Sequence, residues 1–316
     1  MQKLMNHSDE GNPLVSVVMT AYNHERYIEQ ALQSVLIQKT NFRYEILICD
    51  DASTDGTARI LLKFAELFPG VVIPIIREKN IGGSRNFTDL LRKARGRYIV
   101  FIEGDDYWID EAKMQTQLNY LDNNPSVFCV AHRVKVCGAK GEYLHTVPRY
   151  KFPQNRITVR HFLKGLRFPL TATMIRNVRG DGLNKLIQNI DVGPRNEGDT
   201  TICMFLLDKG AIEILEQEMA VYRYRSLVGH DNYNSITKFP EKIRDKLLLI
   251  KINEELYLGK YFMGWMYIWL AMKILRNVFR GNLLSSKITI PLLLKVIWLY
   301  MTSSIKYMAS RIKPIH

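Results

Sequence analysis

Four short apolar runs, rich in β-branched residues, alternate with three segments of helical periodicity along residues 14–102. Buried parallel strands read as such apolar runs, and parallel neighbours need a crossover connection that is usually a helix. The pattern therefore predicts an α/β fold with a doubly wound, mostly parallel sheet. The expected strands are residues 14–20, 44–49, 71–76 and 97–102; the expected helices are residues 28–36, capped by Asn23, then 54–68 and 84–94.

Each expected strand leads directly into a polar segment. In open α/β sheets, ligands bind beyond the carboxyl ends of the strands. We therefore expect the four polar segments to meet at one edge of the sheet and to form the functional site. They are residues 20–23 (TAYN), 50–57 (DDASTDGT), 80–86 (NIGGSRN) and 103–108 (EGDDYW).

The fourth segment holds three carboxylates, Glu103, Asp105 and Asp106, within four residues. A hard divalent cation such as Mg²⁺ or Mn²⁺ would relieve their mutual repulsion, and it usually completes its ligand sphere with waters and substrate phosphates. The alternative is a solvated acidic turn that precedes a helix. The position after a buried strand, beside three other polar strand ends, favours a metal site that neutralises a departing diphosphate.

The second segment has two adjacent carboxylates. We expect Asp51 to face a ligand, where it would hydrogen-bond a base or a ribose. Asp50 is expected to hold the turn, with Ser53 or Thr54 as the helix cap, and Asp55 to be structural.

The first and third segments offer weaker signals. Gly83, after Gly82, leaves room for a phosphate or sugar to approach the backbone. Arg85 is expected to pair with a diphosphate, and Tyr22 to stack on a base. The alternatives are an ordinary glycine loop and a buried tyrosine at a strand end.

The second half of the chain is less regular. Residues 131–149 suit a hairpin or an exposed loop, and residues 168–175 resemble a strand. A helix is expected at residues 198–208, followed by short strands at 211–215 and 219–224.

Four stretches of the first half resemble the inverting glycosyltransferases of family 2, which have the A-type fold of nucleotide-diphospho-sugar transferases. The resemblance spans residues 14–125 and continues weakly to about 230. It implies a donor pocket, for a uridine-diphospho-sugar, at Thr20, Ala21, Tyr22, Asn23 and Asp51. It also implies that Asp105 and Asp106 bind the ribose and the metal, while Glu103 stands where the family usually has Asp. The stretches are VSVVMTAYNHERYIEQALQSVLIQ, YEILICDDASTDGT, EKNIGGSRNF and GRYIVFIEGDDYW.

The resemblance also implies a general base that takes the proton of the acceptor hydroxyl. Asp199 fits the family position best, with Glu197 as the second choice. Without the resemblance, Asp199 would be an acid at a helix N-terminus, which the helix dipole favours.

Three further segments are similar to the acceptor side of the family's site. Arg223 matches the family's Tyr-Arg-x-His segment; Arg225 replaces the His, and His230 is close enough in sequence to substitute for it. The alternatives are an Arg that contacts the diphosphate directly and a strand with an exposed basic end. The other acceptor-side candidates are Trp108, Thr171 and Thr173.

The formal net charge of +13 indicates an anionic partner. From residue 238 onward there are 14 Lys and Arg against 4 Asp and Glu, so most of the excess lies in the last quarter of the chain. The remainder is close to neutral, which argues against a nucleic-acid-binding surface. We expect a catalytic domain at residues 1–235 and a helical, basic extension at residues 236–316.

Two segments of the extension, residues 257–279 and 288–308, mix aromatic residues, Met and Leu with Lys and Arg. This composition suits helices that lie in the interface of an anionic membrane. The alternatives are packing on the catalytic domain and pairing in a homodimer. A single span at residues 288–309 is disfavoured by the central Lys295. Interfacial binding would suit a saccharide or lipid-linked saccharide acceptor at the inner face of the cell membrane.

The remaining signals exclude other classes. The 4 cysteines show no metal-binding or disulfide spacing, which fits a reducing, cytoplasmic compartment. Residues 1–13 are polar and do not resemble a secretory signal. A nucleotidyltransferase would need a Gly-rich phosphate loop after the first strand, which residues 20–23 lack. A non-catalytic sugar-nucleotide-binding or scaffolding protein of the same fold remains the alternative to an enzyme.

Overall fold

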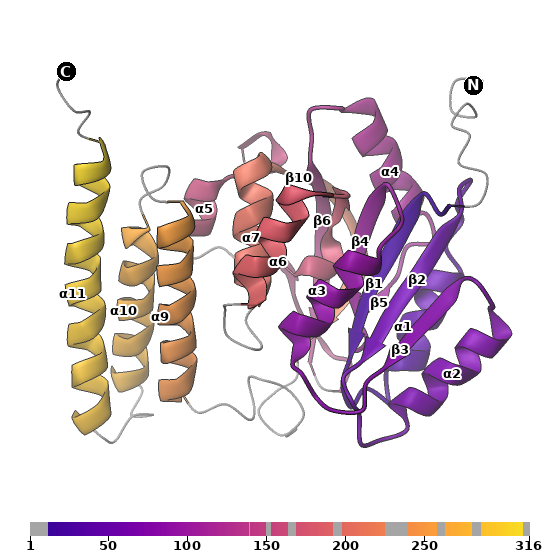
Figure 1. Ribbon diagram of the computed structural model, residues 1–316, viewed down its shortest axis with the longest axis horizontal. Coiled ribbons are helices and arrows are strands. Elements are labelled where there is room, and N and C mark those ends of the chain that lie inside the picture. Colours follow the sequence, from indigo (N-terminus) through magenta and orange to yellow (C-terminus); the bar gives the residue numbers. More distant parts are fainter. Residues whose placement is uncertain are drawn as a thin grey trace.

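The computed structural model describes residues 12–138, 140–149, 153–163, 169–191, 198–224, 239–257, 263–279 and 286–311. An amino-terminal α/β body carries three carboxy-terminal helices along one side (Figure 1).

The first half of the body is a parallel sheet between two helical layers. β1 (Val15–Ala21) lies between β2 (Tyr44–Asp50) and β4 (Tyr98–Glu103), and β3 (Val72–Ile76) pairs with β2, all in parallel. α3 (Gly83–Lys93) covers one face, and α1 (Ile28–Leu36) and α2 (Thr57–Leu67) cover the other (Figure 1). The apolar runs explain this arrangement, because strands covered by helices on both faces are buried on both sides. The predicted α/β class is confirmed.

The sheet continues beyond β4 with mixed pairings, in the order β3-β2-β1-β4-β9-β6-β10-β5. β9 (Met174–Arg176) runs antiparallel to both of its neighbours, whereas β6 (Cys129–Cys137) and β10 (Ile212–Arg223) pair in parallel. β5 (Tyr107–Trp108) closes this edge against β10. The other described elements of the body are α4 (Lys113–Asn123), β7 (Tyr143–Val147), η1 (Pro153–Asn155), β8 (Arg156–Ile157), α5 (Val159–Leu163), η2 (Leu170–Ala172), α6 (Asp181–Asp191) and α7 (Gly198–Lys209).

Three expectations for the second half can be compared with these elements. The hairpin is confirmed, because β7 folds back antiparallel on β6. The strand expected at 168–175 is largely wrong: residue 168 lies outside the described residues, η2 occupies the centre, and only Met174 and Ile175 belong to a strand, β9. The two strands expected at 211–215 and 219–224 are one strand, β10, whose register against β6 shifts on either side of Glu218. A β-bulge of this kind keeps a strand paired through a local irregularity.

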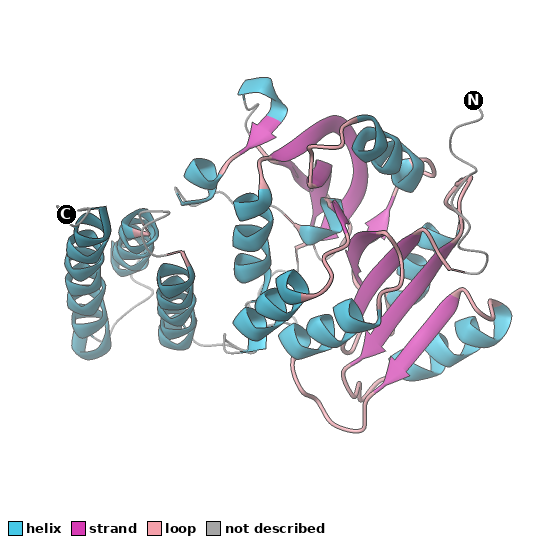
Figure 2. Cartoon of the chain, turned by 45° about the horizontal axis from the view of Figure 1, so that its top comes forward, coloured by secondary structure: helices cyan, strands magenta, loops and turns pink. Residues whose placement is uncertain are grey.

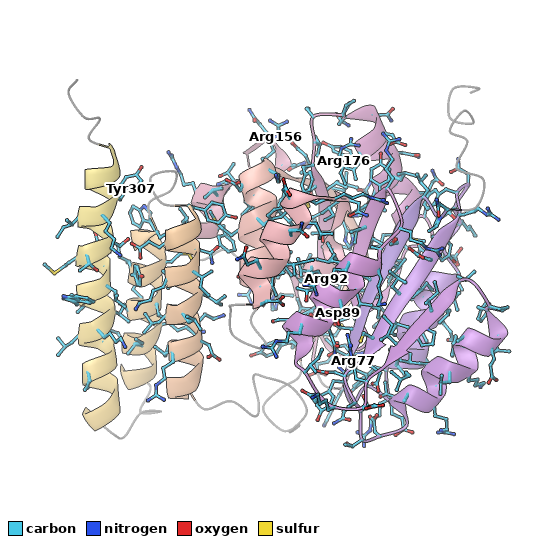
Figure 3. The ribbon with its side chains drawn as sticks, in the orientation of Figure 1. Arg77, Asp89, Arg92, Arg156, Arg176 and Tyr307 are labelled. Carbon is cyan, nitrogen blue, oxygen red and sulfur yellow. The ribbon has the colours of Figure 1, made fainter. Side chains whose placement is uncertain are left out.

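Ion pairs join neighbouring elements of the helical layer that covers the front of the sheet in Figure 1. Arg77, which follows β3, and Arg92 both contact Asp89 of α3 (Figure 3), the latter at 2.9 Å. Arg92 also reaches Asp191, the last residue of α6, at 3.4 Å. The chain of charges joins the end of β3 to the end of α6, from which the polypeptide leads toward α7.

The three carboxy-terminal helices are α9 (Phe239–Leu256), α10 (Gly264–Phe279) and α11 (Ser286–Arg311). They lie side by side, with α9 against α7 of the body and α11 outermost (Figures 1 and 2). The predicted helical extension is thus present, and its inner faces pack on protein. Among the described residues, no helix combines the length and the apolar character that a membrane span needs.

Candidate functional site

The carboxyl ends of the four parallel strands meet at one edge, as the sequence predicts. Ala21 is level with Asp50, and Thr20 with Glu103, in the strand register. The backbone N–H of Asp51 donates to Ala21 O at 2.9 Å, and that of Gly104 donates to Thr20 O at 2.9 Å. The polar segments that follow these strands are therefore held together directly.

Asn23 joins the first two of these segments. Its backbone has a φ of 53°, a left-handed conformation that Asn adopts more readily than most residues. Its N–H donates to Ser53 Oγ and its Oδ1 accepts from the N–H of Thr54, both at 2.9 Å. The prediction that Asn23 caps the first helix is wrong: α1 begins at Ile28, and no side chain caps it.

The turn after β2 partly follows the prediction. Asp50 accepts from the N–H of Ser53 at 3.2 Å and so holds the turn. Asp55 is structural as expected, since it accepts from the N–H groups of Thr57 and Glu25. The caps expected at Ser53 or Thr54 are absent, because α2 begins three residues beyond Thr54, at Thr57, with Gly56 at its N-cap.

Asp51 holds the loop that precedes α3. One of its oxygens accepts from the N–H of Ile81 at 2.7 Å and the other from the N–H of Gly82 at 2.8 Å. Gly82 has a φ of 95°, which glycine adopts without strain. Asp51 is only 3% exposed. Its carboxylate therefore places the loop, and its contact with a ligand stays a prediction.

The residues expected around a donor differ in exposure. Tyr22 is 36% exposed beside the strand ends, whereas Ala21 is 3% exposed and contributes backbone. Gly83 and Arg85 lie in the first turn of α3 and are both exposed. The start of α3 thus carries an exposed cation, Arg85, which suits an anion.

The acidic segment, residues 103–106, contains one buried carboxylate, that of Asp106. Asp106 is 1% exposed, whereas Glu103 and Asp105 are half-buried. Asp106 Oδ1 accepts from the N–H of Arg223 at 3.0 Å, while its Oδ2 makes no hydrogen bond within the described part of the chain. Burial, then the charges of Asp105 and Glu103, raise the pKa of Asp106 well above its usual range. A buried oxygen without a partner, beside other carboxylates, is suited to a cation.

Gly104 allows this segment to pack closely on α1. A Cβ at this position would lie 2.7 Å from Ile28 Cδ1, 2.8 Å from His24 Nδ1 and 3.2 Å from Thr20 O. The glycine between Glu103 and Asp105 is therefore required by space.

Arg223 lies over the acidic segment. Its guanidinium donates to Asp105 O and to Gln30 Oε1. It also lies 4.8 Å from the ring centroid of Tyr27 and 4.5 Å from that of Tyr107. The sequence assigned Arg223 to the acceptor side, whereas the structure places it against the expected metal-binding carboxylates.

Sequence reasoning missed the other three contacts of this guanidinium. Tyr107 stands inside the quoted EGDDYW segment, and its position beside Asp106 was the available signal. Tyr27 and Gln30 are three residues apart and therefore share one side of the chain at the start of α1.

Three of the other acceptor-side candidates are buried, and their role stays a prediction. Trp108, Thr171 and Thr173 are 3%, 1% and 0% exposed. Trp108 points to the opposite face of β5 from Tyr107, because side chains alternate along a strand. Its ring centroid lies 4.1 Å from Lys113 Nζ.

A buried polar network surrounds Trp108 and η2. Lys113 donates to Gln117 Oε1 at 2.8 Å, and Gln117 donates to Ala172 O at 2.9 Å. Burial lowers the pKa of Lys113 and, together with the Lys113 charge, that of His132. These buried groups hold η2 and β5 against α4.

The expected base is only partly described. Asp199 lies in the first turn of α7, and the position of its side chain is outside the description. Glu197 and His230 lie outside the described residues.

The side chains around Asp106 fit one mode of divalent-cation binding but not another. Within the described ranges, no group of three or more His, Cys, Asp and Glu side chains is gathered around a common metal position. Mg²⁺, however, commonly uses one or two carboxylates and takes its other ligands from water and phosphate. The free Oδ2 of Asp106 fits that mode of binding, with substrate phosphates completing the sphere.

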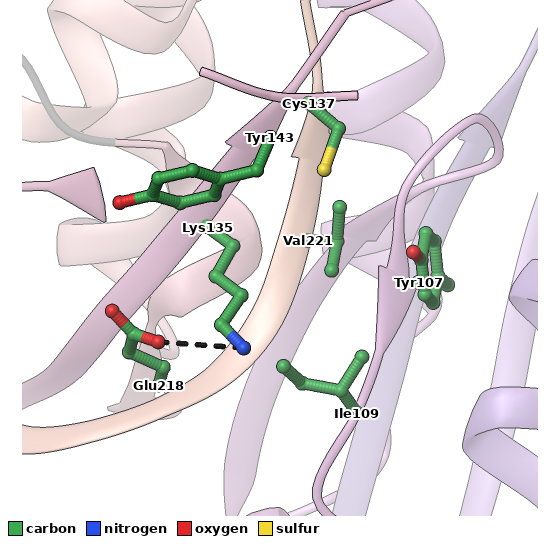
Figure 4. A pocket seen from close by; sticks show the side chains of 7 residues that line it. All are labelled: Tyr107, Ile109, Lys135, Cys137, Tyr143, Glu218 and Val221. Carbon is green, nitrogen blue, oxygen red and sulfur yellow. Dashed lines mark ion pairs between the residues drawn. The ribbon is translucent and has the colours of Figure 1, made fainter. Parts of the chain in front are cut away.

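A cavity of about 460 Å³ is lined by residues of β5, β6, β7 and β10 (Figure 4). Tyr107 forms one wall and Tyr143 of β7 another, and the ion pair of Lys135 with Glu218, at 3.6 Å, crosses it. Tyr107 thus borders both this cavity and the guanidinium of Arg223. The complete lining is Tyr107, Ile109, Lys135, Cys137, Tyr143, Glu218 and Val221.

Residues 16–178, more than half of the chain, match the family described as Glycosyl transferase family 2, and the protein belongs to this family. A protein of Mycobacterium tuberculosis called uncharacterized is 45% identical over 122 residues, which are 39% of this chain and 35% of that protein. The Escherichia coli UDP-Glc:alpha-D-GlcNAc-diphosphoundecaprenol beta-1,3-glucosyltransferase WfaP is 37% identical over 117 residues, which are 36% of this chain and 44% of WfaP. The matched region thus spans less than half of each relative.

Among solved structures, S. aureus TarS 1-349, crystallised with UDP-GlcNAc, superposes with a TM-score of 0.63. The superposition covers 92% of this chain and 81% of that one at 19% sequence identity. It confirms the A-type glycosyltransferase fold.

Proposed function

We propose that this protein is an inverting glycosyltransferase that moves a sugar from a nucleotide diphosphate, UDP, to an acceptor hydroxyl in the synthesis of a cell-surface polysaccharide or glycolipid. The observation that carries the proposal is Asp106: a buried carboxylate in the segment after β4, with one oxygen held by the N–H of Arg223 and the other available. A purely structural acidic turn would be solvated, because burying an unpaired charge is costly.

The nucleotide is assigned to the sheet edge between β1 and β2. Tyr22 is exposed there for stacking, and Thr20, Ala21 and Asn23 provide backbone and polar groups beside it. Asp51 contributes by holding the Gly82 loop, and each of its carboxylate oxygens retains a second lone pair that can accept from a base or ribose.

The diphosphate is assigned between the start of α3 and the acidic segment. Gly83 leaves room for the diphosphate to approach the backbone, Arg85 offers a cation on one side, and Arg223 offers a guanidinium on the other. Mg²⁺ or Mn²⁺ would be held there by Asp106 and Asp105, and Glu103 would contribute less directly. When bound, the cation supplies positive charge to the departing diphosphate.

Transfer with inversion needs one base and one in-line attack. The acceptor oxygen forms a bond to the anomeric carbon, the bond to the diphosphate oxygen breaks, and that oxygen keeps the electron pair. We assign the acceptor proton to Asp199, at the start of α7, with Glu197 as second choice. The buried network at Trp108, Thr171 and Thr173 would position the acceptor side from within, and His230 is proposed to face the acceptor.

The acceptor is proposed to be a saccharide carried by a lipid diphosphate. WfaP, which is 37% identical over 117 residues, is named for a UDP-sugar donor and an undecaprenol-linked acceptor. The acid-poor, basic extension supports a reaction at the inner face of the cell membrane, with the protein bound peripherally.

The test is a panel of nucleotide sugars with Mn²⁺, read by thermal stabilisation and by sugar transfer or donor hydrolysis. Stabilisation by a UDP-sugar is expected, and it should be weaker after chelation. Asp106→Asn and Asp199→Asn should each abolish transfer, while Asp181→Asn, an exposed acid of α6, should not. Unchanged transfer in both site variants would refute the assignment, and donor binding without any turnover would favour a non-catalytic sugar-nucleotide-binding protein.

A further inference from the structure

α11 is apolar on two opposite faces. Val296, Leu299 and Ser303 are 0%, 6% and 2% exposed and pack toward the neighbouring helices. On the other side, Leu294, Trp298, Met301 and Ile305 are 61%, 61%, 59% and 61% exposed. Their spacing of four, three and four residues places them in one stripe along the helix. A helix at the surface of a water-soluble body is normally polar on that side.

The outer stripe of α11 is long and continuous. From Leu294 to Ile305 it extends about 16 Å along the axis, at about 1.5 Å per residue. On α10, Trp265 and Met272 are 47% and 57% exposed and share one side of their helix, seven residues apart. α11 is also the outermost element of the molecule (Figure 1). Single exposed apolar residues are ordinary, but a contiguous stripe indicates an interaction surface.

The charges around the stripe select the partner. After Glu255 the sequence contains 9 Lys and Arg and no Asp or Glu. Lys295 and Lys306 are exposed, and each directly follows a stripe residue. If two copies met through this face, cations would oppose cations with no carboxylate to pair them. An anionic lipid surface complements both the apolar stripe and its charge.

We propose that the outer face of α11 docks on an anionic membrane, with the helix axis parallel to the surface. Leu294, Met301 and Ile305 would enter the acyl boundary, and Trp298 would lie at the level of the headgroups. Lys295 and Lys306 would reach the phosphates along their flexible stems. Because the inner face of α11 stays packed on the protein, docking needs no unfolding of the extension.

The experiment measures co-sedimentation of the full-length protein with vesicles of phosphatidylcholine alone or mixed with phosphatidylglycerol. Binding to the mixed vesicles is expected to exceed binding to neutral ones at least tenfold, and to weaken with salt. Changing Leu294, Trp298, Met301 and Ile305 together to Ser should reduce that binding at least tenfold. The matched control changes Ile37, Leu62 and Leu67 to Ser, which are 54%, 50% and 60% exposed on the body, and should bind as the wild type does.

A second variant, with Lys295→Glu and Lys306→Glu, keeps the apolar stripe and should lose mainly the preference for anionic vesicles. Circular dichroism and thermal unfolding check that each variant is folded. The proposal is overturned if the wild type binds neither vesicle, or if the stripe variant binds undiminished. A third outcome also overturns it: the wild type is a dimer in sedimentation equilibrium, the stripe variant is a monomer, and neither binds vesicles. The stripe would then bind a second copy of the chain. No donor or acceptor is needed, so failure of docking is distinguishable from failure of the proposed transfer.

Discussion

The backbone N–H of Arg223 donates to Asp106 Oδ1 at 3.0 Å, and this bond joins residues that are 117 positions apart in the chain. It ties the end of β10 to the acidic segment after β4. The side chain of Arg223 continues the contact by donating to Asp105 O. One residue from the second half thus fixes the acidic segment and places a positive charge on it.

Replacing Arg223 by Ala should reduce transfer about 10²-fold, in the range observed when a charge-stabilising group is removed from an active site. The backbone bond to Asp106 survives this change, so the loss reports the guanidinium. Arg223→Lys should recover only part of the rate, because an ammonium cannot make the two-sided contact. Initial rates at saturating donor provide the measurement, and Arg59→Ala, an exposed arginine near Glu25, is the control. A rate equal to the wild type in Arg223→Ala would contradict the role.

Asp51→Asn should weaken donor binding and destabilise the protein. An amide has one accepting oxygen, so the N–H of either Ile81 or Gly82 loses its acceptor. Leaving a buried donor without a partner costs about 1–3 kcal/mol. Urea unfolding measures the free energy, and titration with UDP measures the affinity. Unchanged values in both would show that the loop holds its position without this carboxylate.

Gly104→Ala should destabilise the protein by about 1–3 kcal/mol, as overpacking of a filled site generally does. The new methyl would meet Ile28 and His24 at 2.7 and 2.8 Å, and the acidic segment would shift outward. Transfer activity should fall with stability. Gly210→Ala is the matched control, since a Cβ there meets nothing within 4 Å, and it should change stability by less than about 0.5 kcal/mol. Equal unfolding midpoints for the two variants would disprove the close packing.

His132 should make stability depend on pH below its ordinary pKa of 6.5. Burial, followed by the Lys113 charge, lowers the pKa of His132 in the folded protein. As pH falls below 6.5, the unfolded chain binds a proton that the folded one excludes, so stability decreases toward acid by up to about 1.4 kcal/mol per pH unit. His132→Asn keeps a donor for Arg133 O and removes the titration. Denaturant unfolding from pH 7 to 5 should show a shallower slope in the variant; parallel slopes would exclude His132 as the cause.

The sequence by itself determined the parallel half of the sheet and the location of the site. The apolar runs before Thr20 and Glu103 are fully buried strands, because helices on both faces demand continuous hydrophobicity. Because the strands are parallel, the polar segments that follow them lie at one edge of the sheet, independent of the conformation of the loops. The quoted segments of this half were also enough to predict the family.

Tertiary structure alone decided what each polar residue at the edge contacts. Asn23 and Asp51 bind neighbouring loops through hydrogen bonds that span about 30 residues, and no local periodicity encodes such bonds. The burial of Trp108 depends on α4, whose Lys113 packs against the ring. The partnership of Arg223 with Asp106 depends on the pairing of β10 with β5, a contact between distant strands. Sequence patterns report local conformation and burial, whereas these contacts arise only when separate elements pack together.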